Sequence, residues 1–314
     1  MKRKLQIILI VIIMLSPLLS VSKAKNIEIN DNKSSNEQWY YLPSYSNYAP
    51  NGLPDFDQRQ EESWHGRLTW AFCVPVALAD VLWWFDSKHS DPNGYPGDGV
   101  DDYPLVKEYE IPSDPEPGPN KDDHNYNNVN DPNTPWDGSD GNGELIEQIA
   151  NYVDIFWYKI PFLYVEGTDR FSLANGAREW IKDAGLEDEY KVENIYKPSF
   201  ELIKDRVMKN QGVVLRLGCY LPNLNILCPL LIGHTVAVAG VNPDGYIAVS
   251  NPLFDIANPC DNRTLHNNPG IVSHDICKID NNTPYPTISN FWIPDLGKHR
   301  SVIVIAAIII SEIN

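Results

Sequence analysis

The sequence is poor in positive charge. Its 314 residues contain 25 Lys and Arg against 42 Asp and Glu, for a formal net charge of −17 at pH 7. A chain of this charge repels phosphate backbones, so we expect no nucleic-acid partner, whereas a solvated extracellular protein is compatible with it. Hydrophobic residues make up 43% and charged residues 21%, which indicates a globular chain and excludes a disordered one.

Long apolar runs are also scarce. One lies within residues 1–24, where basic residues precede it and small residues at 22 and 24 suit a cleavage site. This pattern predicts a secretory signal peptide, with a membrane-retained signal anchor as the alternative. A second run, 301–310, is too short and too β-branched for a spanning helix and predicts a buried strand. We therefore expect no stable membrane span after signal removal, and a secreted, extracellular or cell-surface location.

Cysteines number only five, and an odd count in an exported protein suggests one free thiol. Cys73 is the natural candidate for it. The other four form two pairs that are close in the sequence, and we predict the disulfides Cys219–Cys228 and Cys260–Cys277. Four cysteines allow three connectivities, so the sequence alone leaves the pairing open.

Turn-forming residues divide the chain. Residues 25–50 are polar and predict a flexible mature N-terminus. A domain at 51–314 follows, interrupted at 89–143 by a long acidic loop rich in Asp, Asn, Pro and Gly. Carboxylate and amide oxygens are suitable Ca²⁺ ligands, but the loop lacks EF-hand spacing. A solvated loop is therefore the favoured interpretation, and no metal or other cofactor is expected.

Helical patterns precede strand patterns within this domain. We predict helices at 73–88, 143–155, 172–185 and 199–210, and strands at 213–217, 234–241, 246–250, 287–293 and 301–311. The residues Asn242 to Gly245 predict a hairpin turn. This order predicts an α+β fold in which an N-terminal helical half packs on a C-terminal antiparallel sheet.

Three residues occur in an order typical of nucleophilic catalysis. Cys73 begins the first predicted helix, where the helix dipole would lower the pKa of a thiol. His234 precedes the hairpin turn and Asn251 follows it, which makes them diagonal neighbours on one sheet face, roughly 7 Å apart at Cα. The amide would then orient the imidazole and leave its second nitrogen for the thiol.

Each of the three residues also has an ordinary structural explanation. Cys73 is equally typical of an inert buried thiol, and His234 of a core histidine on a strand. Asn251 suits a turn before Pro252. Only their order, spacing and context, taken together, favour catalysis.

The segments around these residues resemble a known family. The helix segment 70–87 runs WAFCVPVALADVLWWFDS, and Gly233-His234 and Ser250-Asn251-Pro252 follow later in the chain. Together with the upstream segment 55–60, they are similar to papain-like cysteine peptidases related to bacteriocin double-glycine-leader peptidases (the peptidase C-39-like family), in a secreted branch. The resemblance covers roughly residues 50–310.

The resemblance implies a papain-like fold and a role for each matching residue. Cys73 would be the nucleophile, His234 the general base and acid, and Asn251 the orienting group. Gln58, or Gln60, would complete the oxyanion hole. The family usually has Gly where this chain has Val74, whose side chain could crowd a substrate, and often has Asp at the position of Asn251.

The implied function is that of a secreted cysteine peptidase. It would cut peptide bonds of a peptide or protein substrate through a thioester on Cys73. The alternative is a catalytically inactive papain-like surface module that binds peptide or cell-wall material. The first predicts an accessible thiol of lowered pKa, whereas the second tolerates a blocked one.

Overall fold

The computed structural model describes part of the chain, namely residues 39–45, 52–54, 56, 72–89, 102–106, 145–153, 156–160, 163–167, 172–221, 226–252, 275–281, 285–293 and 298–313. The chain divides into two units, Met1–Asn36 and Glu37–Asn314, and every described residue belongs to the second. The predicted signal peptide and most of the acidic insert lie outside the described residues, as do Gln58, Gln60 and Cys260.

The described residues contain the helices α2 (Cys73–His89), α3 (Leu145–Tyr152), α4 (Ser172–Asp183) and α5 (Phe200–Met208). Each overlaps a predicted helix and confirms it, with small differences at the ends. The Ser199 hydroxyl caps α5 by accepting a hydrogen bond from the Leu202 N–H at 3.2 Å. Gly185, which follows the end of α4, has a φ of +73° and donates its N–H to the Lys182 carbonyl at 2.8 Å.

Helix α2 is the buried centre of the molecule. Every residue from Val74 to Ser87 is buried, as expected for a helix that is apolar almost all round. Pro75 lies in the first turn, where its missing N–H removes no helical hydrogen bond. The same turn closes through the Val76 N–H, which donates to the Phe72 carbonyl at 3.0 Å. Strands β5 and β6 and helix α3 pack against α2.

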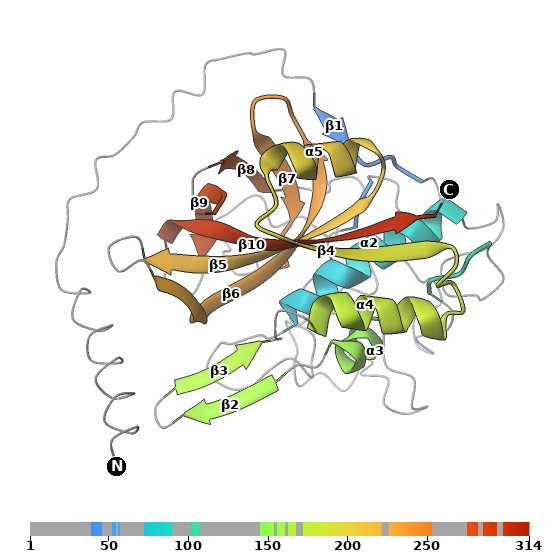
Figure 1. Cartoon of the computed structure of the whole chain (residues 1–314), viewed down its shortest axis with the longest axis horizontal. Helices are drawn as coiled ribbons and strands as arrows, with labels where there is room; N and C mark the ends of the chain where they lie inside the picture. Colours follow the sequence, from blue (N-terminus) through green and yellow to red (C-terminus); the bar gives the residue numbers. More distant parts are fainter. Residues whose placement is uncertain are drawn as a thin grey trace, which may run out of the picture. The chain divides into compact units, whose positions relative to one another are not determined.

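Eight strands form the main sheet: β1 (Tyr40–Tyr41), β4 (Tyr190–Tyr196), β5 (Gly212–Leu221), β6 (Ile226–Val241), β7 (Tyr246–Ser250), β8 (Asp275–Asp280), β9 (Thr287–Ile293) and β10 (Lys298–Glu312). A separate hairpin joins β2 (Phe156–Ile160) to β3 (Leu163–Gly167). In the main sheet the order is β6-β5-β10-β9-β8-β7, and β7 pairs again with β6. These six antiparallel strands therefore close into a barrel (Figure 1).

The predicted fold class is wrong. Instead of a helical half packed on a sheet, the structure is a closed six-stranded antiparallel barrel with few helices among the described residues. Closure depends on β8, whose sequence carries little pattern and which was not predicted. Strand β4, which was not predicted either, pairs with β10 outside the closed barrel. It also depends on pairing between β5 and β10, two strands far apart in the sequence, which no local periodicity encodes.

Strand β10 links the parts of this barrel. One edge pairs with β5, while the other pairs first with β9 and then with β4. Its residues Val302 to Ser311 are buried, so the predicted buried strand at the C-terminus is confirmed. A strand that has neighbours on both edges and on both faces buries all of its side chains, so its sequence is a continuous apolar run.

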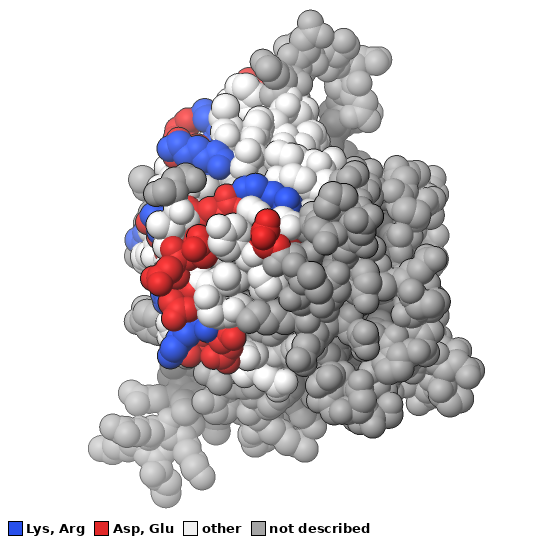
Figure 2. Space-filling model, turned by 90° about the vertical axis from the view of Figure 1, so that its right-hand side faces the viewer, with Lys and Arg blue, Asp and Glu red and all other residues white. Residues whose placement is uncertain are grey.

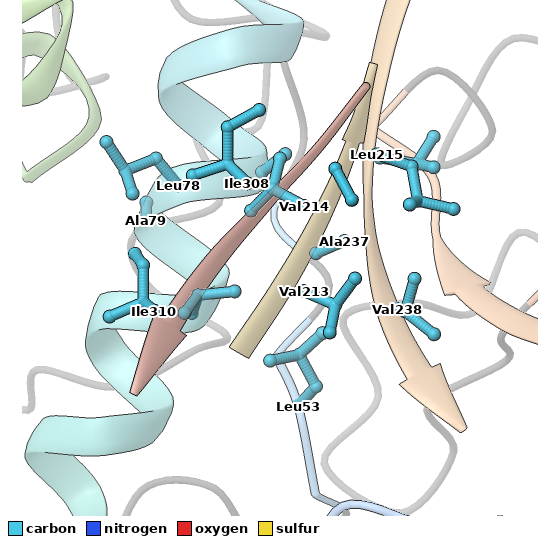
Figure 3. Close-up of a cluster of buried hydrophobic side chains, with 14 of the residues drawn as sticks. Leu53, Leu78, Ala79, Val213, Val214, Leu215, Ala237, Val238, Ile308 and Ile310 are labelled. Atoms are coloured by element: carbon cyan, nitrogen blue, oxygen red, sulfur yellow. The ribbon is translucent and has the colours of Figure 1, made fainter. Parts of the chain in front are cut away.

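The core lies where α2 meets the outer face of the barrel. Leu78 and Ala79 of α2 lie beside Ile308 and Ile310 of β10 in the close-up of this cluster (Figure 3). Gly212 marks the closest approach of β5 to the helix, because a Cβ at this position would collide with Val81. The helix therefore packs directly on the backbone of β5.

The hairpin β6–β7 confirms the predicted turn. Oδ1 of Asn242 accepts hydrogen bonds from the N–H groups of Asp244 and Tyr246, each at 3.0 Å. Gly245 has a φ of +92°, which a glycine adopts without strain. Ala237 then pairs with Ser250 across the hairpin, which fixes the register of the residues that follow β7.

Acidic and basic side chains lie next to one another on the described part of the face in Figure 2. Helix α5 contains two ion pairs between residues one turn apart. Lys204 pairs with Glu201 at 2.5 Å, and Lys209 pairs with Asp205 at 2.9 Å. None of the helices in the described ranges combines the length and apolarity needed to cross a membrane.

Candidate active site

The thiol of Cys73 lies at the start of α2. Cys73 is the first residue of the helix and is partly exposed. Burial of the sulfur raises the pKa of the thiol, whereas hydrogen bonds from Thr235 and the positive charge of Arg216 act to lower it. Burial prevails, so the pKa lowering expected from the helix start is not met and the thiol is protonated at neutral pH.

Arg216 and Thr235 form the floor beneath this thiol. They are direct partners on β5 and β6, so their side chains leave the sheet on the same face. Gly212, four residues before Arg216 on β5, faces α2, and alternation along the strand puts Arg216 on that face too. The start of α2 therefore lies over a threonine and a cation, neither of which was predicted from the sequence.

His234 lies next to Thr235 on β6 and is almost fully buried, with 6% of its surface exposed. Its Nε2 is 2.7 Å from Oδ1 of Asn251, so the predicted diagonal contact across the hairpin is present. Burial lowers the pKa of His234 to about 4, and the hydrogen bond to Asn251 opposes this effect. The imidazole is therefore neutral at neutral pH, the state in which it can accept a proton.

Asn251 is held from its other side by a residue that the sequence did not indicate. Its Nδ2 donates a hydrogen bond to Oδ2 of Asp275, at the start of β8, at 2.9 Å. Because the segment 275–280 was not predicted as a strand, no register argument could bring Asp275 to the hairpin. The only available signal was the alternation of apolar residues at positions 277 and 279.

The thiol and the imidazole lie at neighbouring positions of β6, but strand alternation directs the side chains of Thr235 and His234 to opposite faces of the strand. The thiol interacts with Thr235, and the imidazole belongs to the preceding residue, His234. Cys73 and His234 both belong to the described part of the chain, and no hydrogen bond joins them there. Catalytic hydrogen bonds are often long in ligand-free proteins, so the predicted roles of the two residues stay predictions.

A short segment ties the two halves of this site together. The Ser250 hydroxyl donates to the Pro54 carbonyl at 2.6 Å, and the Phe56 N–H donates to Oδ1 of Asp80 on α2 at 3.1 Å. Strand β7 and helix α2 are thus joined through residues just before Gln58. The predicted oxyanion role of Gln58 or Gln60 lies outside the described residues.

Val74, the residue after the candidate nucleophile, is 5% exposed and belongs to the hydrophobic core. Its side chain is therefore directed into the protein, and the crowding of a substrate expected from its β-branched side chain does not follow from this position. In the described part of the chain, no three His, Cys, Asp or Glu residues form a group that would hold a metal ion.

Comparison with known proteins adds little to this site. No protein-family model matches the chain, and no curated protein is detectably similar in sequence. Among solved structures, it is similar to active wild-type interpain A, a cysteine protease of Prevotella intermedia, with 14% identity and a TM-score of 0.36 over 86% of this chain and 98% of that one.

A second similar structure is a mutant fragment of prointerpain A from the same organism. The identity is 17% and the TM-score 0.32, over 69% of this chain and 66% of that one. TM-scores of this size do not establish a common fold. The function of this chain is therefore inferred from its own site, in which a thiol at a helix start contacts Thr235 and a buried imidazole oriented by Asn251 belongs to the preceding residue.

Proposed function

We propose that this protein is a cysteine peptidase with Cys73 as its nucleophile. The observation that carries the proposal is the contact of 2.7 Å between His234 Nε2 and Asn251 Oδ1, in a strand whose next residue interacts with the thiol. Nucleophilic catalysis needs an imidazole oriented by an amide and a thiol within its reach. The oriented imidazole is present, and the thiol at the helix start contacts the residue that follows it on β6.

The reaction follows from these groups. As the sulfur of Cys73 attacks the substrate carbonyl carbon, its proton passes to Nδ1 of His234, and the carbonyl oxygen becomes an oxyanion. Backbone N–H groups in the first turn of α2 are candidates to stabilise that charge. Collapse of the intermediate breaks the C–N bond, and the imidazolium returns the proton to the leaving amine. Water, deprotonated by the same imidazole, then hydrolyses the thioester and releases the acid and the free thiol.

The protonation states suit a neutral resting pair. The imidazole is neutral above about pH 4 because of its lowered pKa, and the thiol is protonated because burial raises its pKa. Proton transfer therefore accompanies attack, and a preformed thiolate–imidazolium pair is not required. The nearby charge of Arg216 favours the thiolate as it forms. This chemistry uses no metal or organic cofactor.

The second candidate is a non-catalytic module that binds peptide or cell-wall material. Two observations favour it: the raised pKa of the Cys73 thiol, and the lack of a hydrogen bond between the described groups of Cys73 and His234. Either candidate fits an exported protein, which the N-terminal 24 residues predict. Its partner would be a peptide or protein, not a nucleic acid.

Labelling with a peptide vinyl sulfone, an electrophile that reacts with activated thiols, separates the two candidates. A peptidase is labelled at Cys73, and His234→Ala slows the labelling strongly because the thiol loses its base. Iodoacetamide, which needs no enzymatic activation, serves as the control for simple access to the sulfur. Equal, slow labelling of both proteins by the vinyl sulfone would reject the peptidase and favour the binding module.

A further inference from the structure

A chain of two side-chain hydrogen bonds leads from His234 across three strands. Oδ1 of Asn251 faces Nε2 of His234 at 2.7 Å, and Nδ2 of the same amide donates to Oδ2 of Asp275 at 2.9 Å. We propose that Asp275 is a positioning residue that sets the tautomer of His234 through the amide of Asn251. The catalytic meaning of this role rests on the proposed peptidase function.

The barrel builds this chain by its register. His234 and Asn251 lie on one face of the β6–β7 hairpin, two residues off the direct pairing, because Ala237 pairs with Ser250. Asp275 pairs directly with Val249, so it is again two residues away from Asn251 on the neighbouring strand. Two diagonal contacts of the same kind therefore bring the three side chains into line.

The donor and acceptor groups of these three side chains fix the orientation of the Asn251 amide. An ionised carboxylate only accepts hydrogen bonds, so the end of Asn251 that faces Asp275 must be its NH₂ group. The carbonyl end then faces His234 and can only accept, so Nε2 must carry the proton. Nδ1 then has no proton and keeps its lone pair. In this tautomer Nδ1 is the nitrogen that can accept a proton from the thiol.

Without the carboxylate, this direction is lost. An amide can flip and present NH₂ to Nε2, which would place the imidazole proton on Nδ1 and remove the base. Only 6% of His234 and 1% of Asn251 are exposed. Little water can therefore replace a missing hydrogen-bond partner, and the orientation of the amide determines which nitrogen of the imidazole carries the proton. Asp275, which is half-buried, joins this pair from β8, the strand that neighbours β7 in the barrel.

The test is the tautomer itself, measured in the full mature chain. Long-range ¹H–¹⁵N NMR distinguishes Nε2–H from Nδ1–H imidazole, and His234→Gln assigns the signals of His234 among the seven histidines. We expect the Nε2–H form in the wild type and a mixture of both forms in Asp275→Ala. Asp275→Asn retains an acceptor oxygen and should lie between them. Asp280→Ala is the matched control, because Asp280 also lies on β8 and accepts a side-chain hydrogen bond, from Ser289 at 3.1 Å.

Activity provides the second measurement. Asp275→Ala should lower kcat by about 10-fold or more at nearly unchanged KM, which is less than the roughly 10⁴-fold known for loss of a directly bonded orienting carboxylate. The double variant N251D/D275N exchanges carboxylate and amide, and should restore the Nε2–H tautomer and part of kcat. Thermal unfolding of each variant shows whether the barrel is intact.

The outcomes separate the two proposals. A wild-type tautomer in folded Asp275→Ala overturns the positioning role, whatever the activity. A tautomer shift in Asp275→Ala supports that role even if no variant, including the wild type, cleaves peptides. That last result would reject the peptidase function and leave the hydrogen-bond chain as a feature of the barrel.

Discussion

Arg216 on β5 and Thr235 on β6 are direct cross-strand partners, and both act on the thiol of Cys73. Thr235 contributes hydrogen bonds and Arg216 a positive charge, each of which lowers the pKa that burial raises. The thiol therefore depends on two strands that lie far from it in the sequence. If Cys73 is a nucleophile, its reactivity is set by this pair as well as by His234.

Replacing Arg216 should make the thiol less acidic. Arg216→Met removes the positive charge with a side chain of similar length, so we expect the pKa of Cys73 to rise further. Arg216→Lys keeps the charge and should stay closer to the wild type. The measurement is the rate of iodoacetamide reaction at Cys73 against pH, followed by mass spectrometry of its peptide. One common pH profile for all three proteins would show that Arg216 does not act on the thiol.

Removing the candidate nucleophile should separate activity from stability. Cys73→Ala should abolish peptide hydrolysis while changing the unfolding temperature little, because Cys73 is partly exposed at a helix end. Asn251→Ala should reduce kcat less, since the amide orients the base and does not react, but it leaves a buried imidazole N–H unsatisfied and costs about 1–3 kcal/mol of stability. Equal and mild losses of activity in both variants would argue that neither residue takes part.

The stability of the protein should depend on His234 in acid. The pKa of His234 is lowered to about 4, below its ordinary value of 6.5, so the unfolded chain binds this proton more readily than the folded one. The free energy of unfolding therefore falls as the pH decreases from about 6.5 to about 4, by up to about 3 kcal/mol from this group. Above pH 6.5 the contribution is fully present.

His234→Gln is the control for this effect, because it retains a polar side chain that cannot take up the proton. Urea unfolding at pH 7.5 and pH 4.5 gives the stability of both proteins, and carboxylates that also titrate cancel in the comparison. We expect the wild type to lose more stability between the two pH values than the variant. The same loss in both would contradict the lowered pKa.

Two glycines test the packing of the barrel against α2. Gly212→Ala places a Cβ against Val81 and Phe85 and should cost about 1–3 kcal/mol. Gly233→Ala, next to the candidate base, meets no atom within 4 Å and should change stability by less than about 0.5 kcal/mol. Chemical unfolding of both variants measures the difference, and a neutral Gly212→Ala would mean that the helix does not lie this close to β5.

The predicted disulfides can be mapped directly. Cys219 and Cys228 are opposite each other in the register of β5 and β6, and cross-strand Cα separations of about 4.5–5.5 Å fall within the range that a disulfide spans. We expect peptide mapping without reduction to find this bridge. A second bridge should join Cys260 to Cys277, and Cys73 should remain reduced. A bridge that includes Cys73 would remove the nucleophile and the proposed mechanism with it.

Local patterns in the sequence determined the helices and the central hairpin. The apolar run after Cys73 predicts α2, and the residues Asn242 to Gly245 predict the turn, because both depend on neighbours a few residues apart. The same turn places His234 and Asn251 on one face by strand alternation alone. The hydrogen bond between them was therefore predictable before any tertiary structure was known.

Only the tertiary structure decided the closure of the barrel and the groups that surround the thiol and the imidazole. Asp275 reaches Asn251 because β8 pairs with β7, and Arg216 reaches Cys73 because β5 carries it beneath the start of α2. Neither residue stands out in the sequence, since a single charged side chain on a short strand has no periodic signature. Pairing between distant strands depends on how the whole chain buries its apolar faces, and that balance is a property of the fold, not of any one segment.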